Sequence, residues 1–348
     1  MPSVSVVIPC YKYGHFLEAC TRSVLEDQPG VDVRVLIIDD ASPDDSANVA
    51  RSIAARDSRV EFVAHTENRG HIATYNEGLL DWADGDYSVL LSADDLLTPG
   101  ALTRATALLD ADPDVAFVYG HPIHFRPDMP LPVARTEGVR WSVWSGEWWL
   151  ERRFREAKGC VTSPEVVVRT DLQKKVGGYD PELPATGDME MWMRLAVQGK
   201  VGHLGNVDQA YYRFHPASMS KTTYAKNVVD LVHRKRAYDR ILTRYGDQLG
   251  GDVAWSDLVN KELARQALWE ACRAYDRRRM DSVSVEELES FARSCWPDLE
   301  SLVGYRTLRL RQRIGPNVMP YLQPFVWSAF LRRTQDWRWW KSWERQGV

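Results

Sequence analysis

Apolar residues in the first third of the chain form short continuous runs, and stretches with helical spacing separate them. Continuous apolar runs are typical of strands buried on both faces of a parallel sheet. The alternation predicts an α/β fold, a doubly wound, mostly parallel sheet with helices on both faces. The predicted strands are 3–8, 33–39, 60–65, 87–92 and 115–119, and the predicted helices are 15–27, 42–56, 72–82 and 98–110.

The alternation ends after Gly120, and the pattern changes twice beyond it. A proline-rich stretch at 121–140 predicts a loop, and an aromatic, partly helical segment follows at 141–149. Beyond Pro216 the pattern is helical to the end of the chain. Between these parts we expect strands at 165–169, 201–204 and 210–214, and helices from 171 and at 188–198.

Two predicted strands run directly into paired carboxylates, Asp39–Asp40 and Asp94–Asp95. In open α/β sheets ligands bind outside the carboxyl ends of the strands, so both pairs are expected to face one crevice. Clustered carboxylates repel one another unless a cation or a donor-rich ligand neutralises them. The pattern therefore favours a hard divalent metal ion that holds a phosphate.

Composition adds few constraints beyond those of a soluble globular protein. The 348 residues carry a formal net charge of -4, which argues against nucleic-acid binding through a basic surface. Five scattered cysteines without a CxxC pair predict a reduced, cytoplasmic chain without a zinc site. The first apolar run is too short for a signal peptide, and no run is long enough for a transmembrane helix.

Four short motifs occur in a fixed order: VSVVIPCY at 4–11, IDDAS at 38–42, NRG at 68–70 with NEG at 76–78, and SADD at 92–95. Together they resemble the donor half of family 2 glycosyltransferases, which have the GT-A fold. The resemblance covers roughly residues 3–220. It implies transfer of a sugar from a nucleotide-diphosphate donor to an acceptor hydroxyl, usually with Mg²⁺ or Mn²⁺. It also implies a GT-A domain at 1–220, with a donor half (1–120) and an acceptor half (121–220), before a helical extension at 221–348.

The donor-site residues follow from the strand ends and from the resemblance. Asp39 matches the residue that contacts the pyrimidine base, and Pro9 and Tyr11 leave the first strand at the same edge. Asp95 matches the family's metal ligand, and Asp94 is expected to contact the donor substrate. The ordinary alternatives are a capping or loop aspartate, a loop tyrosine and a surface turn.

On the acceptor side, GDMEMWMRL at 187–195 is similar to the family's acidic motif, in which an aspartate is the catalytic base. Asp188 matches that base, although Gly187 replaces the usual preceding acid. A carboxylate opposite the leaving group can take the acceptor's proton, and direct displacement then inverts the reacting centre. The start of a helix favours the ionised form of this carboxylate. His215, with Ser218 and Ser220, resembles the family's loop near the diphosphate and is expected to bind the metal. A helix N-cap and a structural histidine are the alternatives.

Departures from the family pattern keep a second interpretation open. Tyr75 stands where the family often has an arginine, for which Arg69 is a possible substitute. With Gly187, this departure leaves a catalytically inactive nucleotide-sugar-binding or scaffold protein as the alternative. An oxidoreductase lacks its GxGxxG motif, and a nucleotidyltransferase gives no reason for Asp188 and His215.

The segment QDWRW at 335–339 matches the QxxRW signature of processive synthases, but it lies far beyond Asp188 and without membrane spans. The sequence therefore favours a non-processive enzyme of polysaccharide, cell-envelope or glycolipid synthesis. Its expected acceptor is a carbohydrate or a lipid-linked glycan.

Tryptophans gather at 141–149 and 327–343. The first group fits either a core or an acceptor pocket that stacks on sugar rings. The second alternates with basic residues and fits a docked helix or peripheral contact with the inner face of a membrane. Its members are Trp327, Arg332, Arg333, Trp337, Arg338, Trp339, Trp340, Lys341, Trp343 and Arg345.

Overall fold

The computed structural model describes residues 1–215, 227–250, 254–322 and 327–348. The chain divides into two compact units. The first comprises Met1–Leu150, Gly159–Pro216 and Arg345–Val348, and the second comprises Glu151–Lys158 and Ala217–Glu344. Ser218 and Ser220, which the sequence placed in the His215 loop, lie outside the described residues.

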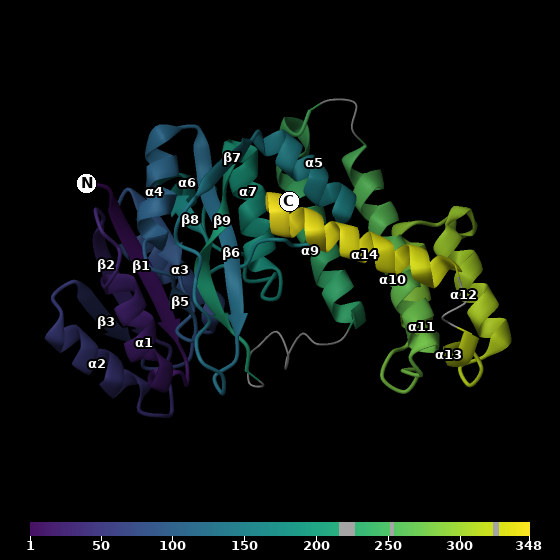
Figure 1. The fold of residues 1–348 in the computed structure, drawn as a ribbon, viewed down its shortest axis with the longest axis horizontal. Helices are drawn as coiled ribbons and strands as arrows, with labels where there is room; N and C mark the ends of the chain where they lie inside the picture. The colour runs from purple at the N-terminus through teal and green to yellow at the C-terminus, as the bar shows by residue number, and fades with distance from the viewer. Residues whose placement is uncertain (216–226, 251–253, 323–326) are drawn as a thin grey trace. The chain divides into compact units, whose positions relative to one another are not determined.

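The first unit is built on one sheet, which has nine strands among the described residues, in the order β3-β2-β1-β4-β8-β6-β9-β5, with β7 paired to β9 (Figure 1). Neighbours β1–β2, β2–β3, β1–β4 and β6–β9 run parallel, whereas β5, β7 and β8 pair antiparallel. The predicted α/β class with a mostly parallel sheet is therefore confirmed. The strands are β1 (Ser3–Cys10), β2 (Asp32–Asp39), β3 (Val60–Ala64), β4 (Tyr87–Leu90), β5 (Leu96–Leu97), β6 (Val115–Phe125), β7 (Arg140–Trp144), β8 (Val167–Arg169) and β9 (Lys200–Arg213).

Both faces of this sheet are covered because successive side chains of a strand point to opposite sides. Val6 and Ile8 of β1 lie in one apolar cluster with Leu17 of the first helix. Val7 points the other way, and a Cβ on Gly78 would lie 2.3 Å from its side chain. The helices of this unit are α1 (Gly14–Leu25), α2 (Ser46–Arg56), α3 (His71–Asn76), the π-helix η1 (Glu77–Trp82), α4 (Ala101–Ala111), α6 (Thr170–Val176), α7 (Gly187–Gln198) and the start of α5 (Gly146–Glu156).

Four local predictions were wrong. Residues 121–125 continue β6, because Pro122 falls at a register shift where a missing N–H is tolerated. Residues 140–144 form strand β7 rather than part of a helix, and 200–213 form one strand instead of two. Helix α2 begins at Ser46 rather than at Ser42, because the Ser42 backbone N–H donates to Asp39 instead of opening a helical turn.

The second unit is helical, as the sequence predicted, and it packs around the end of α5. Phe154 of α5 lies edge-on to Tyr238 and Trp255, with ring centroids 4.8 Å and 5.1 Å apart. Arg311 and Asp276 form a buried ion pair at 2.8 Å. Within the described ranges, no helix is long and apolar enough to cross a membrane. The elements are α9 (Asn227–Tyr245), η2 (Gly246–Gln248), α10 (Trp255–Asp276), α11 (Val285–Cys295), η3 (Leu299–Ser301), α12 (Val303–Ile314), α13 (Met319–Leu322) and α14 (Trp327–Gln346).

Candidate active site

Strands β1 and β2 end side by side and present the expected base-binding residues. Asp39 is the last residue of β2 and is 2% exposed. Its Oδ2 accepts a hydrogen bond from the Ser42 N–H at 3.1 Å, whereas its buried Oδ1 has no partner among the described residues. A buried carboxylate oxygen without a partner costs free energy unless a ligand supplies the donor. Pro9 lies in β1, and Tyr11 follows that strand with a 42% exposed ring.

Backbone strain accompanies these strand ends. Lys12 and Ala41 both have positive φ, 64° and 55°, which non-glycine residues rarely adopt. The Lys12 N–H donates to the Ser42 hydroxyl at 2.9 Å, so the two strained turns support one another. Strained backbone conformations persist only where the surrounding structure holds them, and they are concentrated at ligand and active sites.

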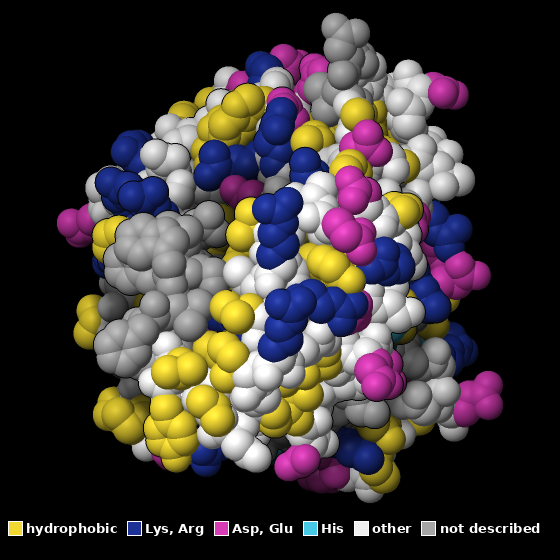
Figure 2. Space-filling model, turned by 90° about the vertical axis from the view of Figure 1, so that its right-hand side faces the viewer, with side chains coloured by type: hydrophobic (Ala, Val, Ile, Leu, Met, Phe, Trp, Pro, Cys, Tyr) yellow, Lys and Arg dark blue, Asp and Glu magenta, His cyan; other side chains and the backbone are white. Residues whose placement is uncertain are grey.

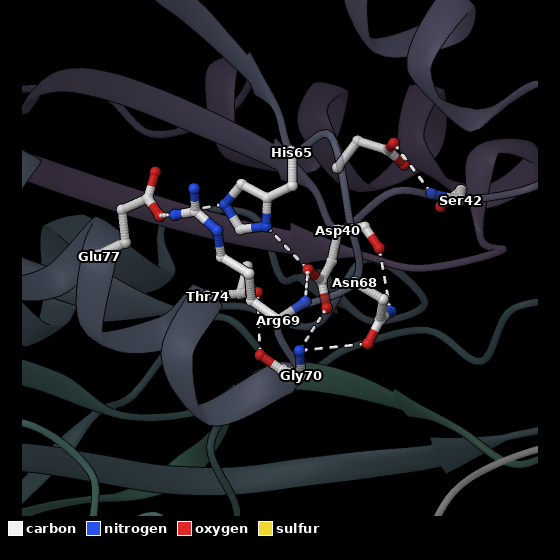
Figure 3. Close-up of polar contacts among 9 residues, drawn as sticks. Asp40, Ser42, His65, Asn68, Arg69, Gly70, Thr74 and Glu77 are labelled. Carbon is white, nitrogen blue, oxygen red and sulfur yellow. Dashed lines mark hydrogen bonds and ion pairs between the residues drawn. The ribbon is translucent and has the colours of Figure 1, made fainter.

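The second carboxylate of the first pair serves a different purpose. Oδ1 of Asp40 lies 2.7 Å from Nδ1 of His65 and accepts the Arg69 N–H, and Oδ2 accepts the Gly70 N–H (Figure 3). The His65 ring continues to Glu77, whose Oε2 lies 3.0 Å from Nε2. Asp40 is therefore fully engaged in holding the loop before α3, and the expectation that both carboxylate pairs face one crevice was wrong for Asp40.

The second carboxylate pair meets the end of β9. Nε2 of His215 lies 2.9 Å from Oδ2 of Asp94, and Oδ1 of Asp95 accepts the Arg213 N–H at 2.8 Å. The Arg213 side chain donates to the Asp94 carbonyl and lies over the Phe16 ring, 4.3 Å from its centroid. The imidazole is thus next to Asp94 rather than Asp95.

The electrostatics of this pair favour a cation. Burial raises the pKa of Asp95 well above its usual range, and the neighbouring charge of Asp94 raises it further. Among the residues that the structure describes, no three His, Cys, Asp or Glu side chains are arranged to bind a metal ion. The carboxylates and the imidazole nevertheless fit Mg²⁺ or Mn²⁺ chemically, if a substrate diphosphate supplies further oxygen ligands.

The expected base, Asp188, is the second residue of α7 and is only partly exposed. Burial raises its pKa, while the N–H groups at the helix start, the Ser163 hydroxyl and His71 lower it. The Ser163 hydroxyl lies 3.4 Å from Oδ2 of Asp188. The net direction is upward, so burial outweighs the helix N-terminus that the sequence argument emphasised. A raised pKa suits a general base, because it increases the proton affinity of the carboxylate.

Glu165 is a buried acid that the sequence pattern assigned only to a strand. Burial raises its pKa to about 8, and the negative charge of Asp188 contributes. Glu165 in turn raises the pKa of Asp95. Its carboxylate accepts hydrogen bonds from the backbone N–H and the hydroxyl of Thr162. No local signal identifies this residue, since a lone Glu before a strand is common.

Helix α3 connects the donor loop with the segment that leads to Asp188. The Asn76 side chain donates to the Tyr179 carbonyl at 2.9 Å and accepts the Tyr179 N–H at 2.6 Å. Nε2 of His71 lies 3.2 Å from the Pro184 carbonyl oxygen. A Cβ on Gly178 would lie 2.5 Å from the Asn76 side chain, so only glycine permits this approach.

The departures from the family pattern occupy defined places. The Tyr75 ring lies edge-on to His71 and Tyr179, with centroids 5.4 Å and 5.6 Å away. Arg69 is half-exposed and forms a 3.0 Å ion pair with Glu77. The guanidinium that the sequence offered as a substitute is therefore bound to a carboxylate.

The first tryptophan group lies away from these carboxylates. Trp149 is 2% exposed and stacks edge-on to Phe117 in the core, whereas Trp141 and Trp148 are half-exposed. Trp141 pairs with Leu204 near the start of β9, roughly 30 Å along the strand from Arg213. The core interpretation therefore holds for Trp149, whereas an acceptor pocket at the half-exposed Trp141 and Trp148 stays a prediction.

Residues 5–170 match the family model described as glycosyl transferase family 2. A chondroitin synthase of Pasteurella multocida is 25% identical over 60% of this chain, but the match spans only 20% of the synthase. A GalNAc(5)-diNAcBac-PP-undecaprenol beta-1,3-glucosyltransferase of Campylobacter jejuni is 31% identical over 35% of this chain and 38% of its own length. Residues 5–170 therefore carry the pattern of the family 2 glycosyltransferases.

Solved structures support the same fold. TarS residues 1–349 of S. aureus, in complex with UDP-GlcNAc, superpose with a TM-score of 0.62, 15% identity and coverage of 91% of this chain and 89% of that one. The mannosyltransferase PcManGT of Pyrobaculum calidifontis, with GDP-Man and Mn²⁺, gives a TM-score of 0.52 at 16% identity, covering 85% of this chain and 88% of its own. The predicted GT-A fold is confirmed.

Proposed function

We propose that the chain is an inverting, metal-dependent, non-processive glycosyltransferase that uses a nucleotide-diphosphate sugar. One observation carries the proposal: Glu165 lies close enough to raise the pKa of Asp95 and to be raised itself by Asp188. This electrostatic link supports the proposal that the donor carboxylates and Asp188 belong to one site, although about 90 residues separate them in the sequence. TarS and PcManGT, which share the fold, were solved with nucleotide sugars.

On the donor side, Asp39 accepts a nucleobase N–H through its unpartnered Oδ1, and Tyr11 packs against the base or ribose above Pro9. Asp94 contacts the donor substrate, and Asp95 and His215 hold Mg²⁺ or Mn²⁺. A bound divalent ion neutralises the diphosphate and eases its departure as a leaving group. The contact between Asp94 and His215 at 2.9 Å supports a shared role for these groups.

On the acceptor side, Asp188 removes the proton of the attacking hydroxyl. Its raised pKa and the Ser163 hydrogen bond support this role, because the carboxylate is held in place and has increased proton affinity. Attack by the acceptor opposite the leaving diphosphate breaks the sugar–phosphate bond and forms the new glycosidic bond with inversion.

The acceptor is a carbohydrate or a lipid-linked glycan, in a polysaccharide, cell-envelope or glycolipid pathway on the cytoplasmic side. Support comes from the matched relatives, a chondroitin synthase and a transferase named for an undecaprenol-linked substrate. We retain the proposal of weak membrane contact through the tail. Trp337 and Trp340 of the tail are 61% and 47% exposed, which supports this contact. The Trp339 indole N–H donates to Glu156, as expected for a helix docked on the protein.

One observation supports the alternative of an inactive nucleotide-sugar-binding protein: Arg69, the possible substitute for the family's arginine, is paired with Glu77. A hydrolysis assay with a panel of nucleotide-diphosphate sugars, with Mn²⁺ or with EDTA, separates the two. We expect slow Mn²⁺-dependent hydrolysis that EDTA abolishes. Donor binding without any hydrolysis or transfer would support the inactive alternative, and absence of donor binding would contradict both.

A further inference from the structure

Helix α12 of the second unit has two distinct faces. Gly304, Leu308 and Arg311 are buried, three residues that recur every three or four positions. The exposed face carries Val303 and Leu310, which are 66% and 47% exposed. Arg306 and Arg313 are also exposed. Spacings of three, four and three residues place these four side chains in one stripe along the helix.

The exposed stripe is followed by further apolar residues at α13 and the turn before it. Val318, Tyr321 and Leu322 are 49%, 70% and 41% exposed. The Arg278 guanidinium lies 5.1 Å from the centroid of the Tyr321 ring and donates to the Asn317 carbonyl, which fixes this turn. Figure 2, turned toward the side where Figure 1 shows α12 and α13, shows hydrophobic and basic side chains interspersed. We call the seven residues of α12 and α13 the basic–apolar surface: Val303, Arg306, Leu310, Arg313, Val318, Tyr321 and Leu322.

The charge of this segment is one-sided. Residues 302–322 contain four arginines and no acidic residue, in a chain whose net charge is -4. Arg309 is paired with Glu289, and Arg311 is paired with Asp276 in the interior. Arg306 and Arg313 have no ion pair among the described residues, so their charge is available to a ligand outside the chain.

We propose that the basic–apolar surface binds an anionic lipid membrane. Exposed arginines attract anionic headgroups, while leucine, valine and tyrosine side chains between them enter the boundary of the acyl chains. A second copy of the chain is the less favourable occupant, since a symmetric contact through this face brings arginines against arginines. The proposal concerns α12 and α13, not the α14 tail, and gives the proposed transferase access to a lipid-linked acceptor.

The test is flotation of the full chain with phosphatidylcholine vesicles, with and without 30% phosphatidylglycerol. We expect binding to the anionic vesicles alone, weakening as salt increases. The double substitution Arg306→Glu with Arg313→Glu is expected to reduce partitioning of the protein onto the vesicles at least about 20-fold. Each arginine removed near an anionic surface lowers the partition coefficient about fivefold, and the two losses multiply. Leu310→Ser with Tyr321→Ser gives a smaller loss that salt does not alter.

Matched controls are Arg51→Glu on α2 and Val133→Ser, both at exposed positions of the first unit. Trp337→Ser with Trp340→Ser isolates the contribution of the tail. The inference is overturned if wild type does not float, or if the α12 variants lose no more binding than the controls. A change in oligomeric state of those variants, measured by light scattering, indicates a second copy instead. Hydrolysis of a soluble donor by the same variants stays at the wild-type level, so failure of membrane binding leaves the proposed function standing.

Discussion

The two sides of the candidate site are built in different ways. The donor side takes its carboxylates from the last residue of β2 and from the short segment between β4 and β5, so their positions are visible in the sequence. The acceptor side combines Asp188 at the start of α7 with Ser163 and Glu165 from a loop and with α3, which contacts the segment before α7. A strand end positions a residue by local structure alone, whereas the acceptor side depends on contacts across more than a hundred residues.

The largest expected effect tests whether the acceptor side carries the chemistry. Asp188→Asn removes the base while keeping the size of the side chain. We expect transfer to fall about 1000-fold with little change in donor affinity. Steady-state transfer rates and calorimetric donor titration provide the measurement. Asp180→Asn, in the loop before α7, is the control, and equal activity of wild type and Asp188→Asn removes Asp188 from the mechanism.

The donor side is tested through its unpartnered oxygen. Asp39→Asn replaces the carboxylate that is proposed to accept the nucleobase N–H with a neutral amide. Because a hydrogen bond to a charged group is the stronger one, we expect the affinity for a nucleoside diphosphate to fall about 10- to 100-fold. Turnover at saturating donor should change little. Asp45→Asn, at the start of α2, is the matched control. An unchanged dissociation constant would remove the assigned base contact.

A substitution in α3 tests whether the two sides are coupled. Asn76→Ala deletes both hydrogen bonds to Tyr179 and leaves a buried backbone N–H and carbonyl without partners. We expect about 2 kcal/mol of lost stability and a kcat about tenfold lower, with KM for the donor nearly constant. Denaturant unfolding and a kcat–KM comparison measure these effects. Asn48→Ala, at an exposed helix position, is the control, and a loss confined to donor KM would place Asn76 on the donor side instead.

The last test concerns the pH dependence of stability at Glu165 and leaves the reaction itself aside. Its pKa of about 8 lies above the ordinary value of 4.5, so the folded state retains a proton that the unfolded state releases between these pH values. Stability contributed by this group therefore falls as pH rises through that window. Glu165→Gln removes the free-energy cost of a buried acid that would be ionised in the unfolded chain. We expect this variant to be about 2–4 kcal/mol more stable than wild type at pH 8, and to have nearly the wild-type stability at pH 5.

Denaturant unfolding at both pH values measures this difference, with the exposed Glu137→Gln as control. A substitution that stabilises equally at pH 5 and pH 8 would contradict a raised pKa at Glu165. Repeating both measurements at high salt separates a buried acid from a general surface-charge effect, because salt weakens only the latter.

Local signals predicted the donor-half strands and the helices α6 and α7 well, and the acceptor-half strands less well. Apolar runs located β1, β2 and β4 within two residues, because buried parallel strands need little but continuous hydrophobicity. The extension of β6 across Pro122 was not visible, since a register shift depends on the partner strand. The role of Asp40 was likewise hidden, because the His65 ring and the Gly70 N–H that occupy it come from later segments.

The sequence by itself indicated a mostly parallel sheet, the resemblance to family 2 glycosyltransferases and the carboxylates near the strand ends. These features depend on short-range patterns of hydrophobicity and on motifs whose residues are contiguous. Tertiary structure alone decided that Asp40 is occupied while Asp39 keeps an oxygen unpartnered among the described residues, that Glu165 interacts electrostatically with Asp95 and with Asp188, and that the pKa of Asp188 is raised. Burial and the proximity of charges arise only when distant segments pack together, and they set the proton affinity of every acid in the site.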